Sequence, residues 1–113
     1  MMQERQPEDQ YAKVTADLLN YPDVTVGGSK GFGSSALKIR GKIFAMLSSG
    51  DKFVVKLPRQ RVESLIAAGE GERFDANHGR WMREWVTIPV DFQDKWLMFA
   101  KEALDFVGSL SND

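Results

Sequence analysis

Apolar and polar positions alternate most clearly in the middle of the chain, between residues 36 and 57. Three short runs rich in apolar residues, 36–39, 42–48 and 52–57, are separated by Arg40-Gly41 and by Ser49-Gly50. A glycine in a two-residue loop between such runs is typical of a β-hairpin. The pattern therefore predicts a meander of three antiparallel strands.

The register of this meander decides which side chains face the core. Two-residue loops at both turns would pair Ile39 with Lys42 and Met46 with Phe53, and directly opposed side chains share a face. An odd-length loop or a bulge would turn one strand over. On the even-loop register the core face carries Leu37, Ile39, Phe44, Met46, Phe53, Val55 and Leu57. The opposite face is partly apolar and rimmed by lysines, and it carries Lys38, Ile43, Ala45, Leu47, Lys52, Val54 and Lys56.

Apolar stripes with helical spacing lie on both sides of this meander. They predict helices over 7–20 and 58–68, the second of them stopped by Gly69, and a last helix that ends at Gly108. Asp91 or Asp94 is expected to cap the last helix. Its core-facing side chains are expected to be Trp96, Phe99, Ala100, Ala103 and Val107.

A second hairpin, turning at residues 76–79, completes the predicted order α-β-β-β-α-β-β-α. The strand connections are short except for the helical crossover, which indicates a two-layer α+β domain. We expect a largely antiparallel five-stranded sheet with helices on one face. The chain of 113 residues forms one domain, 1–113, with its core at about 7–108.

Composition removes several classes of function. The chain has no cysteine, which excludes cysteine-based zinc and iron–sulfur sites and cysteine nucleophiles. The polar N-terminal segment does not resemble a signal peptide, and no stretch approaches the roughly 18 apolar residues of a membrane span. The expected location is the cytoplasm, with no membrane partner.

The formal net charge of −1 hides an uneven distribution. Residues 30–61 carry +7, between an N-terminal segment of −3 and a C-terminal segment of −5. Such a basic segment can bind a polyanion such as nucleic acid, or it can pair with the acidic ends of its own chain. The low charge of the whole chain favours internal pairing.

The stretch 27–41 is rich in glycine, and residues 31–36 satisfy the G-x-G-x-x-G/A spacing of a dinucleotide site. Such a site needs a helix directly after the glycines, because the helix N-terminus binds the pyrophosphate. Here strand residues follow, so the segment is interpreted as a turn. A weaker alternative is an anion-binding loop formed by Lys30, Gly31, Gly33 and Ser34.

No catalytic or metal site is expected. His78, the single histidine, lies in the predicted second turn without a nucleophile at a known spacing. Nearby Glu70, Glu72 and Asp75 lack the spacing of a metal site.

Trp81, Arg83 and Trp85 alternate and would share a face of a regular strand. On a helix-covered face they would be core residues, with arginine at the edge. On an open face they could grip a partner or stack on bases. Which face they occupy is left open, although three tryptophans in a small domain favour the core.

The order of several motifs resembles the TfoX/Sxy N-terminal-domain family, with wider similarity to YjbR/MmcQ-type proteins. The motifs are Gly31-Phe32-Gly33 before the first strand, "LKIRGKIFAML", "FVVKLP", "RFDANHGRWMREWVTIP" and "WLMFAKEALDFV". The resemblance covers about residues 25–107. It implies an α-β(3)-α-β(2)-α fold like that of secretion chaperones, and a regulatory rather than an enzymatic role. It supplies no catalytic residue and no cofactor.

The chain ends at Asp113 without the C-terminal helical domain of full-length competence regulators, so a stand-alone interaction domain is the expectation. The first hypothesis is a non-enzymatic domain that binds a protein partner, or itself, through the open sheet face. The residues of that face are Lys38, Ile43, Leu47, Lys52, Val54 and Lys56. The alternatives are nucleic-acid binding by residues 30–61, and a small anionic ligand at the glycine-rich loop.

Overall fold

The structure is a computed structural model that describes residues 6–27, 36–48, 52–77 and 80–110; at 48, 75–77 and 80–82 it describes the backbone alone. The helices are α1 (Pro7–Leu18), α2 (Arg59–Ala67) and α3 (Trp96–Leu110), and a 3-10 turn, η1 (Val90–Lys95), precedes α3. The strands are β1 (Val24–Val26), β2 (Leu37–Ile39), β3 (Lys42–Ser48), β4 (Lys52–Lys56), β5 (Glu72–Asn77) and β6 (Arg80–Ile88).

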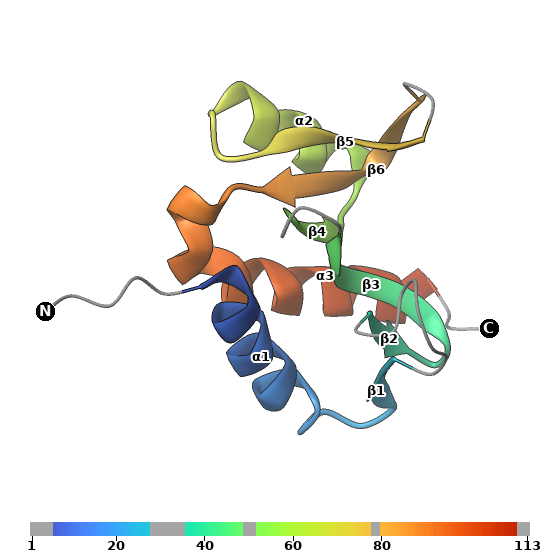
Figure 1. The fold of residues 1–113 in the computed structure, drawn as a ribbon. Helices are drawn as coiled ribbons and strands as arrows, with labels where there is room; N and C mark the ends of the chain where they lie inside the picture. The colour runs from blue at the N-terminus through green and yellow to red at the C-terminus, as the bar shows by residue number, and fades with distance from the viewer. Residues whose placement is uncertain (1–5, 28–35, 49–51, 78–79, 111–113) are drawn as a thin grey trace, which may run out of the picture.

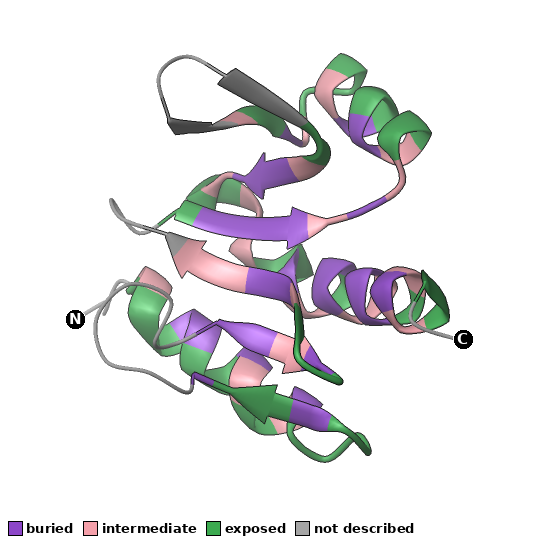
Figure 2. Ribbon diagram, turned by 90° about the vertical axis from the view of Figure 1, so that its right-hand side faces the viewer, coloured by how far each residue is buried: buried purple, intermediate pink, exposed green. Residues whose placement is uncertain are grey.

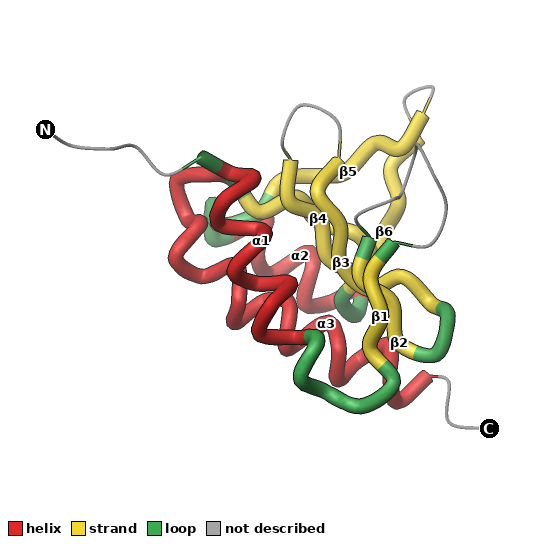
Figure 3. Tube along the Cα trace, turned by 60° about the horizontal axis from the view of Figure 1, so that its bottom comes forward, coloured by secondary structure: helices red, strands yellow, loops and turns green. Residues whose placement is uncertain are grey.

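The described strands form one antiparallel sheet in the order β1-β2-β3-β4-β6-β5. All three helices lie on the same side of this sheet, as Figure 3 shows, and α3 crosses behind its centre (Figure 1). The predicted two-layer α+β class is confirmed. The sheet has six strands instead of five, because the short apolar run Val24–Val26 pairs with β2 as an edge strand.

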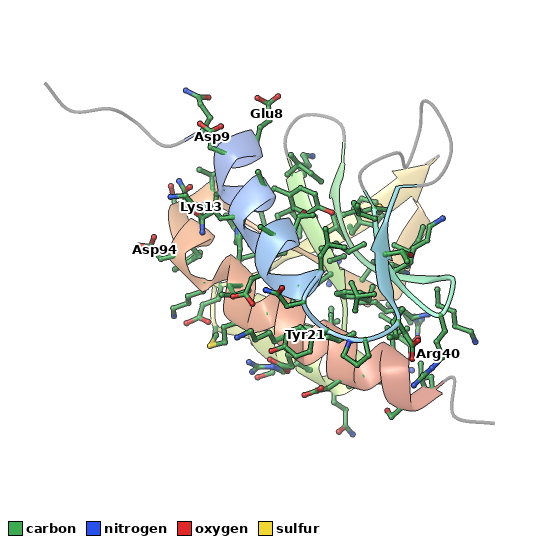
Figure 4. All side chains as sticks on the ribbon, turned by 90° about the horizontal axis from the view of Figure 1, so that it is seen from below. Glu8, Asp9, Lys13, Tyr21, Arg40 and Asp94 are labelled. Atoms are coloured by element: carbon green, nitrogen blue, oxygen red, sulfur yellow. The ribbon has the colours of Figure 1, made fainter. Side chains whose placement is uncertain are left out.

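The tight turn at Arg40-Gly41 has the predicted length of two residues, since Ile39 pairs with Lys42. Both turn residues have positive φ, 50° at Arg40 and 85° at Gly41. Two left-handed residues give the type I′ geometry, whose twist matches that of the flanking strands. The Arg40 guanidinium donates a 3.2 Å hydrogen bond to the carbonyl oxygen of Gly108, near the end of α3 (Figure 4).

The predicted register of β3 is wrong in its second half. The pairs Leu37 with Ala45 and Lys38 with Ile43 leave Phe44 as the extra residue of a bulge. Ser48 pairs with Lys52, so residues 49–51 join β3 to β4 as a three-residue connection instead of the expected two. Because side chains alternate along a strand, this shift exchanges the faces of Ala45, Met46 and Leu47.

The consequence is visible in the burial of these side chains. Ala45 is fully buried and Leu47 packs against the core, whereas Met46 belongs to the opposite face in register with Val54. Phe44 stays in the core as predicted, because the bulge turns it to the same side as its neighbour Ala45.

Aromatic side chains from three elements meet in the centre of the core. Phe53 of β4 stacks on Trp96 of α3 with ring centroids 4.5 Å apart, and Tyr11 of α1 lies tilted at 5.9 Å on the same ring. Buried residues concentrate in the central strands and along α3, as Figure 2 shows. This cluster fixes both long helices against one face of β4.

The helices largely match their predicted stripes. The expected inward residues of α3, from Trp96 to Val107, are all buried, and Gly69 ends α2 with φ 80°. The predicted cap of the last helix is wrong: Asp91 and Asp94 lie within η1, and α3 begins after it. The helix also continues past Gly108 to Leu110.

Candidate functional site

The face of the sheet opposite the helices carries no described helix, and we call it the open face (Figure 3). Cross-strand register places its residues in rows: Lys38 opposes Ile43, Met46 opposes Val54, and Lys56 opposes Trp85. Opposed side chains share a face. The described residues of the open face are Thr25, Lys38, Ile43, Met46, Lys52, Val54, Lys56, Glu72, Trp85 and Thr87.

Four of the six residues expected on this face are accessible there. Lys38, Ile43 and Lys56 are partly exposed and Lys52 is exposed. Of the other two, the expectation for Leu47 is wrong, because Leu47 faces the core. Val54 lies on the open face as predicted, in a row with Met46 and Thr87, but its side chain is fully buried (0%). The apolar part of the open face is therefore smaller than the sequence predicted.

A pocket of about 430 Å³ lies at the β6 end of the open face, and we call it the Trp85 pocket. The Lys56 ammonium lies 5.8 Å from the centroid of the Trp85 ring, a cation–π distance. The half-buried indole therefore forms a flat apolar wall edged by positive charge. The lining residues are Lys56, Arg59, Arg83, Glu84 and Trp85.

The pocket is positive on balance. Lys56 is 3.9 Å from the Glu84 carboxylate, and Arg59 is 3.2 Å from Glu63 one turn along α2. Such exposed pairs are weak, about 0.3–0.5 kcal/mol for the helical one, so both cations stay available to a ligand. Arg83 is exposed and forms no ion pair with any described residue.

The start of α2 adds to this positive potential. Pro58 at the N-cap makes no side-chain cap bond, and the first turn contains no acidic residue. The partial positive charge of the helix N-terminus is therefore not compensated beside the pocket wall that Arg59 forms.

Elsewhere, much of the basic segment 30–61 pairs with the acidic ends of the chain. Arg61 makes two bonds to Glu102 on α3, of 2.7 and 3.3 Å, and Arg40 lies 3.5 Å from Asp23. With Lys56–Glu84 and Arg59–Glu63, these contacts confirm internal pairing for four described cations. Lys38, Lys42 and Lys52 have no ion pair with a described residue.

Several sequence-based expectations fall outside the described residues. The anion loop of Lys30, Gly31, Gly33 and Ser34 is one, and the turn histidine His78 is another. The side chain of Trp81 is also outside them, and the register of β6 shifts between its pairs with Arg73 and Asp75. The regular alternation from residue 81 to residue 85 is therefore not supported.

Sequence reasoning missed the Trp85 pocket because it favoured the core for Trp85. The signal was present in the alternative it left open, a strand tryptophan beside Arg83 on an uncovered face. Met46 was missed because the bulge and the three-residue connection reverse its side, and neither has a clear sequence signature.

Comparison with protein-family models, curated proteins and solved structures found no match for the chain. No helix among the described residues is long and apolar enough to span a bilayer. In the described part of the chain, no three His, Asp or Glu side chains gather closely enough to hold a metal ion.

Proposed function

We propose that this chain is a non-enzymatic interaction domain of the TfoX N-terminal kind that binds an acidic protein partner on its open face. The observation that carries the proposal is the set of cations around three partly exposed apolar side chains. Lys38, Lys52 and Arg83 have no ion-pair partner among the described residues. Between them lie the partly exposed side chains of Ile43, Met46 and Trp85.

This composition suits a transient, polar interface. Apolar anchors surrounded by charge are typical of partners that associate and separate, and complementary charge raises the association rate and excludes wrong partners. A lysine-rimmed surface selects a partner with exposed aspartate and glutamate.

Self-association through the same face is disfavoured by symmetry. In an isologous dimer each patch meets a copy of itself, so the lysines of the open face would oppose lysines. The apolar area is also modest, because Val54 is buried and Leu47 faces the core. A different chain with acidic side chains would pair with the lysines instead of repelling them, and it would not depend on a large apolar area.

Nucleic acid is supported less well. Phosphate binding gains from every unpaired cation in reach, yet Arg40 and Arg61 are held by carboxylates away from the open face. Glu72 and Glu84 also lie on or beside that face and would repel a polyanion. The charge pattern is that of a surface for scattered carboxylates.

Zero-length crosslinking tests the proposal. A carbodiimide joins a lysine amine to a carboxylate in direct contact, so the chain is incubated with lysate of its own source cells, crosslinked and mapped by mass spectrometry. We expect crosslinks from Lys38, Lys52 or Lys56 to Asp or Glu of a recurrent partner. Lys52→Glu should reduce both the crosslinks and the amount of partner captured, and raised salt should do the same.

The matched control is Lys13→Glu, the same charge reversal on an exposed position of α1. It should leave capture unchanged. Crosslinks concentrated at Lys13 and Lys101 would place the partner on the helix layer and contradict the proposal. A Lys52→Glu variant that captures as much as the unaltered chain would contradict it as well.

A further inference from the structure

The Trp85 pocket has a chemistry more specific than the rest of the open face. It combines one flat apolar wall, the Trp85 ring, with three cations, and the uncompensated N-terminus of α2 stands behind one of them. A ligand that fills it needs a negative group and an apolar group a few ångströms apart.

We infer that the Trp85 pocket anchors an extended acidic segment of the partner. One Asp or Glu carboxylate of this segment binds Arg83 and Arg59, and the apolar side chain two residues along packs on the Trp85 ring. The inference rests on the proposed function, because it names the part of the partner that the open face holds.

The spacing follows from strand geometry. In an extended chain the side chains at i and i+2 point to the same side. An acidic residue at i and an apolar one at i+2 therefore reach the cations and the indole together. Guanidinium groups bind carboxylates with two parallel hydrogen bonds, which gives Arg83 and Arg59 a geometric preference for this group.

One feature separates this ligand from a nucleotide strand. Glu84 lines the pocket, and its carboxylate disfavours a multiply charged phosphate backbone more than a single carboxylate.

A peptide titration tests the inference on the full chain. The probe is the blocked octapeptide (Ser-Glu-Ser-Leu)2, which presents Glu and Leu alternately on one side when extended. Its controls are (Ser-Gln-Ser-Leu)2 without charge, (Ser-Glu-Ser-Ser)2 without the apolar group, and the oligonucleotide dT8. Binding is followed by the nitrogen-15 shift of the Trp85 indole N–H, assigned by its loss in Trp85→Phe.

We expect the Glu–Leu peptide to shift the Trp85 indole and both control peptides to bind about fivefold or more weakly. Arg83→Gln should weaken the Glu–Leu peptide by a similar factor, and Lys13→Gln, the same neutralisation on α1, should not. The two altered positions are exposed, and an unchanged thermal midpoint confirms that each variant is folded.

Three results would overturn the inference: equal binding of the Glu–Leu and Gln–Leu peptides, no shift of the Trp85 indole, or tighter binding of dT8 at that indole. Each leaves the broader proposal standing if the carbodiimide crosslinks still map to Lys38 and Lys52. Conversely, the peptide could bind at Trp85 although no acidic partner is crosslinked. That result would contradict the proposed function and still support the inferred ligand of the Trp85 pocket.

Discussion

At the scale of single residues, the fit between α2 and β6 depends on a glycine. A Cβ placed on Gly71 would lie 2.7 Å from Cγ2 of Val86 and 3.1 Å from Cβ of Leu65. Leu65 and Val86 are both buried in the core cluster. The backbone at this position therefore approaches two side chains that have little room to move away.

Gly71→Ala should destabilise the fold by about 1–3 kcal/mol, the usual cost of inserting a methyl group into packed core. Gly108→Ala is the matched control, because its Cβ would meet only Cγ1 of Ile39, at 4.0 Å. That glycine lies inside α3, where alanine stabilises by roughly 0.5–1 kcal/mol. Urea denaturation measures both; equal shifts of the two midpoints would contradict the close packing at Gly71.

Tyr11 gives the fold a defined sensitivity to high pH. Burial of its phenol raises the pKa of Tyr11 well above the ordinary value of about 10. As pH rises, the Tyr11 phenol ionises in the unfolded chain before it ionises in the folded chain. The contribution of Tyr11 to the unfolding free energy is therefore complete below about pH 10 and is lost progressively above it. Tyr11→Phe should flatten the fall of the unfolding free energy between pH 9 and 11, by up to about 1.4 kcal/mol per pH unit.

The control for this prediction is Tyr21→Phe, because Tyr21 is 38% exposed on the surface. It should leave the alkaline slope as it is in the unaltered chain. An identical slope in Tyr11→Phe would show that another group governs alkaline unfolding.

At the scale of elements, one arginine connects the β2–β3 turn to two other parts of the chain. Its guanidinium donates to the Gly108 carbonyl in α3, and the same group lies 3.5 Å from the carboxylate of Asp23, which precedes β1. The backbone N–H of Arg40 also donates to the Asp23 carbonyl, at 3.1 Å. A cation near the C-terminus of α3 is favourable to the helix dipole.

Arg40→Ala should lower the unfolding free energy by about 0.5–1 kcal/mol, a modest effect because the side chain is half exposed. The local effect is larger: backbone amides in the last turn of α3 should exchange with solvent faster. Arg59→Ala is the control, because it removes an exposed ion pair with Glu63. It should leave amide exchange in α3 unchanged. Unaltered exchange in Arg40→Ala would mean that the turn does not hold the helix end.

The elements also show which parts of the fold were predictable. The stripe from Trp96 to Val107, the type I′ turn at Arg40-Gly41 and the stop at Gly69 follow from local chemistry. The bulge at Phe44 does not, because an inserted residue leaves the apolar pattern intact while reversing every side chain beyond it. Because of this reversal, Leu47 faces the core instead of the open face, and Met46 lies on the open face instead of in the core.

Trp85 was unpredictable for a different reason. A strand tryptophan suits either a core or an open face, and only the position of the helices decides between them. Both readings were available from sequence, and composition favoured the wrong one for this residue. The pocket could be recognised only once Arg59, from the start of α2, was placed beside β6.

At the scale of the whole molecule, charge is divided between the two layers. The open face carries three lysines, Lys38, Lys52 and Lys56, against one acid, Glu72. The helices and η1 carry eight acidic and five basic residues, and their acids include Glu8, Asp9 and Asp94 (Figure 4). The net charge of −1 therefore conceals a molecule with one cationic side. Such a molecule orients an acidic partner before contact, and it opposes face-to-face pairing with its own copy.

We therefore expect the free chain to be a monomer of 12.7 kDa. Light scattering should give this mass at low salt, about 20 mM, and at high salt, about 500 mM. Raising the salt screens the repulsion between lysines, yet the partly exposed Ile43, Met46 and Trp85 are too few for the apolar core of a stable dimer. If a two-chain mass is found, Ile43→Asp and Met98→Asp locate the contact. Met98 is 51% exposed on α3, so a dimer broken there uses the helix layer and leaves the open face to its partner. A dimer broken by Ile43→Asp instead would mean that the open face binds its own copy, and the acidic-partner proposal would be wrong.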